Sequence, residues 1–134
     1  MFSSGRLPPG VRPDNDGRSD LGQPRPADRR GRVSVGEIWQ VDFGITQKVR
    51  PALVISIPYA DLDRALIGVI PHTTALRGSQ FEVSLPLRFL AEGAFLVQGI
   101  QAIPPKYFLK RIGVLLPEQL RQVEAALMRW QGLR

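Results

Sequence analysis

Residues 50–57 read RPALVISI, a largely apolar run that begins with an arginine and a proline. A continuous apolar run of this length is typical of a β-strand that is covered on both faces. The proline stands near the start of the run, where a strand tolerates a missing N–H group, and it biases Arg50 toward an extended backbone. We therefore expect a buried strand that has a cation at its first position.

Other short β segments lie on both sides of this run and are separated by turn residues. They either alternate between apolar and polar residues or are rich in Ile and Val, as strands of a small sheet are. The expected strands cover residues 37–43, 50–57, 65–73, 81–85, 94–98, 100–103 and 112–115. Residues 106–110 are expected to form a single helical turn before the last of them.

The end of the chain carries the clearest helix. Its large apolar residues recur at spacings of four and three and so form one stripe: Leu116, Leu120, Val123, Leu127 and Trp130. Pro117 suits the first helical position, and Gly132 suits the residue that ends the helix. Many short strands and one terminal helix predict a mainly β fold, a small and strongly bent sheet or barrel with the helix packed against it.

The first 32 residues differ in composition from the rest. They contain five Pro, five Gly and seven Arg, with almost no large apolar side chains. Such a segment cannot bury enough apolar surface to offset its conformational entropy. We expect a disordered tail over residues 1–32 and one folded domain over residues 33–134. The alternative is that translation begins near residue 33 and that the tail is never made.

Composition narrows the possible functions. The net charge of +6 is shared equally by the tail and the domain, and it favours an anionic partner such as nucleic acid or an acidic peptide. Because the chain has no Cys and a single His, disulfides, thiolate nucleophiles and multi-His metal sites are excluded. No apolar run approaches the roughly 20 residues that span a bilayer, so we expect a cytoplasmic protein without a membrane partner.

Two local features are suited to holding an anion. Residues 48–51, KVRP, place two cations at the mouth of the apolar strand, and the planar fork of Arg50 can bond two oxygens of a phosphate. Residues 71–74, PHTT, place hydroxyl groups at the end of the third expected strand. If these strands are neighbours, Arg50 and Thr73 converge on one anion. A surface basic pair and threonines that merely suit a strand explain the same residues, so the pattern alone leaves both interpretations open.

Four segments in one order resemble the MazF/PemK family of toxin endoribonucleases. They are residues 36–43 (GEIWQVDF), 50–55 (RPALVI), 69–74 (VIPHTT) and 110–115 (KRIGVL), the last followed by a helix. The resemblance runs from about residue 35 to residue 133. It implies a small SH3-like barrel of the CcdB/PemK kind that forms a homodimer, binds a cognate antitoxin and cuts single-stranded mRNA at short sequences. It also implies that no metal ion or other cofactor is needed.

The same resemblance assigns roles to individual residues. It implies that Arg50 and Thr73 carry catalysis, in which the 2′-hydroxyl of the RNA attacks the adjacent phosphorus and leaves a 2′,3′-cyclic phosphate and a 5′-hydroxyl. The residues that we expect to contact RNA around them are Gln47, Lys48, Thr74, Arg77 and Gln98.

Two departures from the family pattern leave the general base open. Residues 98–103 read QGIQAI, where the family commonly has a carboxylate at the first position and an Arg at the fourth. His72 stands beside Thr73, where the family usually has an apolar residue, and a neutral imidazole can act as a base near pH 7. However, the alternation of a strand turns His72 to the face opposite Thr73, which favours a structural or dimer-interface role.

Two alternative functions remain. Because residues 98–103 depart from the family pattern, the domain could be an RNA-binding barrel without catalytic activity. The chain also ends in WQGLR, which is similar to the C-terminal end of the gyrase poison CcdB. Since Trp130 lies on the apolar stripe of the expected helix, packing in the core explains it without a protein target.

Overall fold

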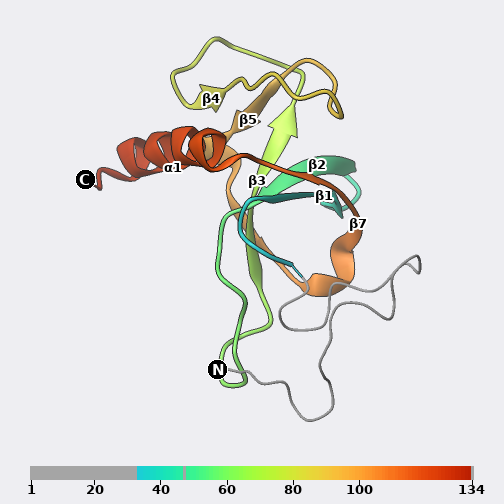
Figure 1. The fold of residues 1–134 in the computed structure, drawn as a ribbon. Helices are drawn as coiled ribbons and strands as arrows, with labels where there is room; N and C mark the ends of the chain where they lie inside the picture. The colour runs from blue at the N-terminus through green and yellow to red at the C-terminus, as the bar shows by residue number, and fades with distance from the viewer. Residues whose placement is uncertain (1–32, 47, 134) are drawn as a thin grey trace.

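The computed structural model describes residues 33–46 and 48–133, which form one curved antiparallel sheet with a C-terminal helix, α1 (Pro117–Gln131), packed against it (Figure 1). The expected tail over residues 1–32, and with it the boundary at residue 33, lies outside the described residues, as does Gln47. No helix in the described part of the chain is long and apolar enough to cross a membrane.

Seven strands form the sheet. Their bounds are β1 (Glu37–Asp42), β2 (Val49–Val54), β3 (Ile67–Thr73), β4 (Glu82–Val83), β5 (Ala94–Leu96), β6 (Gln101–Ile103) and β7 (Phe108–Val114). Their order is β4-β5-β3-β2-β1-β7, and β6 also pairs with β3. The mainly β fold with a C-terminal helix is therefore confirmed. The sheet bends like a small barrel, and within the described residues β4 and β7 remain its two unpaired ends.

Several strand ends differ from the predicted ones. The second strand stops at Val54, because the hydroxyl oxygen of Ser56 accepts a hydrogen bond from the Gly68 N–H at 2.8 Å and ends the backbone ladder. The last strand starts at Phe108, whose ring packs edge-on against that of Trp39 with centroids 6.0 Å apart. The expected helical turn is accordingly confined to a 3₁₀ turn, η2 (Pro105–Tyr107).

Alternate residues of the strands build apolar clusters on both faces of the sheet. One cluster contains Trp39, Val41, Ala52, Val54, Val69 and Phe108. The other contains Ile38, Leu53, Ile70, Phe95, Val97, Val123 and Ala126, so that α1 covers this second face. Three consecutive residues of β2, Ala52 to Val54, are 0% exposed. The prediction that the RPALVISI strand is covered on both faces is therefore confirmed for its middle, whereas Ile57 lies beyond the end of β2 and is 78% exposed.

The helix begins and ends as its sequence predicts. Pro117 is its first residue, and Gly132 follows it in the left-handed region with φ +75°. The prediction that Trp130 packs in the core is wrong, because its side chain is 39% exposed. The last turn of α1 extends past the sheet, and the chain ends beyond it (Figure 1).

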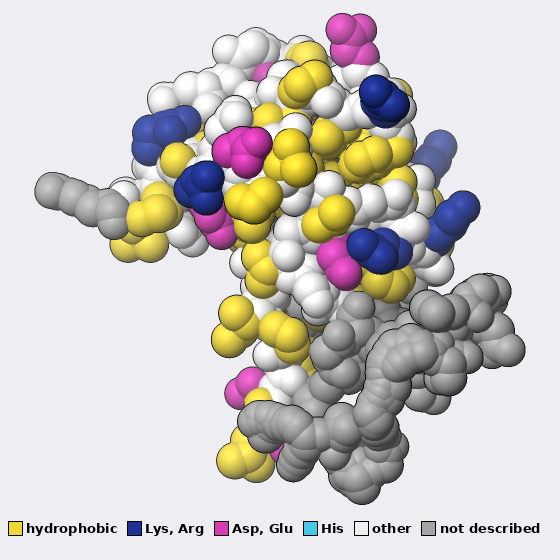
Figure 2. All heavy atoms as spheres, viewed as in Figure 1, with side chains coloured by type: hydrophobic (Ala, Val, Ile, Leu, Met, Phe, Trp, Pro, Cys, Tyr) yellow, Lys and Arg dark blue, Asp and Glu magenta, His cyan; other side chains and the backbone are white. Residues whose placement is uncertain are grey.

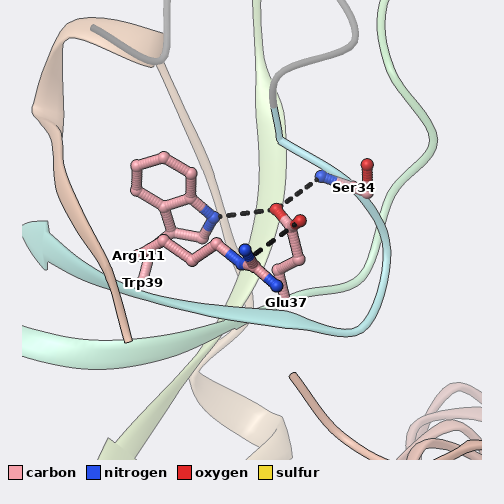
Figure 3. A network of polar contacts seen from close by, with 4 residues as sticks. All are labelled: Ser34, Glu37, Trp39 and Arg111. Carbon is pink, nitrogen blue, oxygen red and sulfur yellow. Dashed lines mark hydrogen bonds and ion pairs between the residues drawn. The ribbon is translucent and has the colours of Figure 1, made fainter. Parts of the chain in front are cut away.

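A polar network joins the start of β1 to the edge strand β7 (Figure 3). One oxygen of the Glu37 carboxylate accepts hydrogen bonds from the Ser34 backbone N–H and the Trp39 indole N–H, both at 3.0 Å. Its other oxygen lies 3.5 Å from Nε of Arg111. The network thus fixes the point at which the chain enters the sheet.

Candidate functional site

A hollow of about 290 Å³ lies where β2 begins and β3 ends. Its lining residues are Lys48, Val49, Arg50, Pro51, His72, Thr74 and Ala91. Two cations, a hydroxyl group and an imidazole thus share one concave surface. Among the described residues that line it there is no carboxylate, so its electrostatic character suits an anion.

Pairing between β2 and β3 brings the start of β2 close to the end of β3. Ala52 pairs with Pro71. This pair lies next to the start of β2 and the end of β3, where His72 and Thr73 also pair with Phe95 and Ala94 of β5. The second strand is therefore a neighbour of the third, as convergence of Arg50 and Thr73 requires.

The turn between β1 and β2 sets the position of Lys48. Its N–H donates to the Gly44 carbonyl at 2.7 Å, and its own carbonyl accepts from the Phe43 N–H at 2.9 Å. These bonds hold Lys48 in the left-handed region, at φ +60°, which is uncommon for a residue with a side chain. The backbone of Lys48 is consequently fixed at the rim of the hollow.

His72 lies at the buried side of the hollow and is 7% exposed. Its ring packs edge-on against that of Phe95, with centroids 5.1 Å apart and planes at 74°. Burial lowers the pKa of the His72 imidazole from its ordinary value, because a low-dielectric surrounding disfavours the charged form. The ring is therefore neutral at pH 7.

Thr73 is buried beside it, at 9% exposed, and is not among the residues that line the hollow. Its hydroxyl oxygen accepts a hydrogen bond from the Ala75 N–H at 3.0 Å, which leaves the hydroxyl hydrogen available for donation. The structure thus brings Arg50 together with His72 and Thr74 in one hollow, whereas Thr73, between the last two in the chain, is not among the lining residues.

Gly93 explains how the segment before β5 fits against the end of β3. A Cβ at this position would lie 2.2 Å from the Thr73 carbonyl oxygen and 2.8 Å from Cε1 of His72. Only a residue without a side chain allows this approach. Sequence reasoning missed both Gly93 and Ala91, although a glycine immediately before a β segment is a sign of close backbone approach.

The same loop is anchored at a second point by Phe89. Three atoms of its ring lie 2.7–3.0 Å from where a Cβ of Gly113 would be. The ring thus rests on the bare backbone of β7, and the loop between β4 and β5 is held at both β7 and β3. Ala91, which lies between Phe89 and Gly93 in the chain, lines the hollow.

The other predicted contacts lie outside the hollow. Arg77 is exposed, and its backbone is fixed because the N–H groups of Arg77, Gly78 and Ser79 donate to the Glu82 carboxylate at 2.8–3.1 Å. The Arg77 N–H makes the largest contribution to lowering the pKa of Glu82. Gln98 is exposed in a 3₁₀ turn, η1 (Val97–Gly99). Within the described residues no group of three or more His, Cys, Asp or Glu side chains is placed to hold a metal ion.

Comparison with known proteins identifies relatives of this fold. The family model described as "PemK-like, MazF-like toxin of type II toxin-antitoxin system" matches residues 34–130. No curated protein sequence matches the chain.

Solved structures show the same fold at low sequence identity. A MazE–MazF complex from Deinococcus radiodurans is 23% identical, with a TM-score of 0.64 over 76% of this chain and 97% of that one. An endoribonuclease in complex with its cognate antitoxin, from a mycobacterial species, is 19% identical, with a TM-score of 0.66 over 76% and 97%. The Mycobacterium tuberculosis toxin MazF-mt6 is 23% identical, with a TM-score of 0.61 over 73% and 98%.

Proposed function

The chain belongs to the PemK-like, MazF-like toxin family of type II toxin–antitoxin systems, and on that premise we propose that it is an endoribonuclease that cuts single-stranded mRNA at specific sequences. The observation that carries the proposal is the hollow, which is lined by Arg50 and Lys48 together with a neutral imidazole and a hydroxyl group. A site with this charge binds a phosphate readily, and among the described lining residues nothing repels one.

The proposed reaction uses a nucleophile that the RNA itself provides. The 2′-hydroxyl attacks the adjacent phosphorus, and the products are a 2′,3′-cyclic phosphate and a 5′-hydroxyl. Such a reaction asks the protein to hold the phosphate in line and to stabilise the added negative charge. Arg50 performs the second task on the equatorial oxygens, and Thr73 donates a hydrogen bond that keeps the geometry. Neither role needs a metal ion or another cofactor.

Residues around the hollow grip the rest of the strand. We assign Lys48 and Arg77 to flanking phosphates, and Thr74, Gln98 and Gln47 to hydrogen bonds with RNA. The fixed backbones of Lys48 and Arg77 support this assignment, because a side chain on a rigid backbone loses less entropy when it binds. Phosphate contacts of this kind make binding fall as salt concentration rises.

Two protein partners belong to the proposal, a second copy of the chain and a cognate antitoxin, both in the cytoplasm. Apolar side chains gather on the face drawn in Figure 2, with Lys and Arg side chains around them. The exposed large apolar residues of β7 and α1 are Leu109, Val114, Met128 and Trp130. A surface of this kind is typical of a protein–protein interface. The related structures from Deinococcus radiodurans and a mycobacterial species hold a toxin with its antitoxin.

The test is RNA cleavage by the purified full chain in excess EDTA, with a long single-stranded RNA whose new ends are mapped. We expect cuts at one short sequence that bear a cyclic phosphate. Arg50→Ala should lose them, since removal of one donor to a developing oxyanion slows a reaction by about a hundredfold to a thousandfold. Arg64→Ala is the matched control, because it removes an exposed cation that does not line the hollow.

Other outcomes separate the alternatives. Cleavage that needs Mg²⁺, or that survives Arg50→Ala unchanged, would contradict the proposal. Intact RNA with salt-sensitive binding would identify an inactive RNA-binding barrel, and intact RNA without binding would direct attention to gyrase or another protein target.

A further inference from the structure

Removal of the proton from the attacking 2′-hydroxyl is a task that the cations of the hollow cannot perform. Arg and Lys side chains are donors without an accepting lone pair while they are charged. The hydroxyl of Thr74 is a poor base in neutral water. Among the described residues that line the hollow, His72 alone carries a nitrogen that can accept a proton near pH 7.

The alternation of β3 brings His72 to the hollow. His72 is itself among the residues that line the hollow, together with Arg50 and Pro51 from the start of β2. The alternation that separates His72 from Thr73 therefore does not remove it from the site.

The ring has a fixed place within that surface. The ring of Phe95 packs edge-on against the imidazole, with the two ring centroids 5.1 Å apart. Its Cε1 edge lies against Gly93, at 2.8 Å from where a Cβ would be. A ring held in this way is preorganised, which is what a proton acceptor in a transition state requires.

From this geometry we propose that His72 is the general base of the RNA cleavage, an inference that rests on the proposed function and names one more catalytic residue for it. A ring nitrogen of His72 takes the proton of the 2′-hydroxyl while the 2′ oxygen bonds to phosphorus. The bond from phosphorus to the 5′ oxygen breaks. A water molecule protonates the departing 5′ oxygen, and the hydroxide that remains takes the proton from His72.

The ionisation state of the ring agrees with this role. Burial lowers the pKa of His72 from its ordinary value of about 6.5, so the accepting form dominates at neutral pH. The charged groups that face the hollow with it are Lys48 and Arg50, from the start of β2 and the turn before it. The contacts from β5 and the loop before it, Phe95 and Gly93, carry no charge.

The test measures single-turnover cleavage from pH 5 to pH 9 by the full chain, on a short RNA that contains the mapped cut sequence. Two variants separate catalysis from packing. His72→Phe keeps an aromatic ring beside Phe95, and His72→Gln keeps a polar side chain without a group that titrates in this range. If His72 is the base, both variants slow cleavage by about a hundredfold to ten-thousandfold. Their melting temperatures, followed by circular dichroism, check that they fold.

The dependence of the cleavage rate on pH is a second test of the role of His72. The wild-type rate should fall on the acid side of the ordinary imidazole pKa, because burial lowers the pKa of His72 and the accepting nitrogen is protonated only below that lowered pKa. This acid limb should be absent in a folded variant. Near-normal rates in His72→Phe, with the acid limb kept, would overturn the inference and indicate a structural ring. Identical pH profiles in wild type and in a folded His72 variant would overturn it as well.

These failures differ from failure of the proposed function. If wild type cuts RNA and Arg50→Ala does not, while both His72 variants cut normally, the nuclease stands and His72 is not its base. If wild type makes no cuts under any of these conditions, both proposals fall.

Discussion

The middle of the β2–β3 ladder and its open end are made by the same two strands, yet they contain different kinds of residue. In the middle, Ala52, Leu53 and Ile70 are apolar and 0% exposed. Only two residues further outward, Arg50 and His72 line a hollow that suits an anion. The comparison teaches that the packed part of a strand can orient reactive side chains at its end, so that the site needs few contacts of its own.

The largest effect should come from the middle of the ladder. Leu53→Ala removes a fully buried side chain beneath α1 and should lower the free energy of unfolding by about 2–5 kcal/mol. Urea denaturation measures this loss. Val49→Ala is the control, because that side chain is 49% exposed on the same strand and should change stability by less than about 0.5 kcal/mol.

A Leu53→Ala protein that cut RNA more slowly but was as stable as wild type would contradict the division between a structural middle and a reactive end of the ladder. In that case the middle of the ladder would act directly on the chemistry. We expect instead that the folded fraction of the Leu53→Ala protein keeps a normal rate of cleavage.

At the open end, Arg50→Lys should act in the opposite manner. The substitution keeps a positive charge but loses the planar fork that bonds two phosphate oxygens. Cleavage should fall by about a hundredfold, since one donor to the developing charge is lost. The midpoint of urea unfolding should stay near that of wild type. If the Arg50→Lys protein were as active as wild type, charge alone would suffice at this position.

Gly93→Ala should affect both regions at once. Its new Cβ would meet the Thr73 carbonyl oxygen, a backbone atom that cannot rotate away, and Cε1 of His72. Overpacking of this kind costs about 1–3 kcal/mol of stability, and the displaced end of β3 should also slow cleavage. The neighbouring Glu92→Ala is the control, because Glu92 is exposed. Unchanged stability and rate in Gly93→Ala would mean that this loop moves freely.

The smallest effect is a dependence of stability on pH. Because burial lowers the pKa of His72, the unfolded chain binds more protons than the folded one once the pH drops below about 6.5. Stability is therefore complete above that value and decreases as pH falls through it. Melting temperatures from pH 8 to pH 5 should show a shallow decrease in wild type and a flatter profile in His72→Gln. Equal slopes would show that His72 protonates without a penalty.

Regular elements could be predicted from the sequence because their patterns are local. The apolar run RPALVISI predicted a strand buried on both faces, and the stripe between Pro117 and Gly132 predicted α1. Strand ends were less predictable. The end of β2 depends on the Ser56 hydroxyl meeting the Gly68 N–H, and residues that far apart in sequence leave no periodic signal.

The candidate site could be predicted in part for the same reason. Lys48, Arg50, His72 and Thr74 were chosen from the ends of two apolar runs, and all four line the hollow. Ala91 and Gly93 were missed, since their placement follows from the loop between β4 and β5 and not from a pattern of their own. The catalytic roles of Arg50 and Thr73 remain predictions that the cleavage experiments address.

The contact between Phe89 and Gly113 has an evolutionary consequence. A Cβ at position 113 would lie 2.7–3.0 Å from three atoms of the ring, so the side chain of Phe89 would have to move away from β7. The two positions should therefore change together as relatives diverge, with a small residue at 89 wherever 113 is larger than glycine. A lineage that enlarged position 113 alone would have to turn the ring of Phe89 away from the backbone of β7.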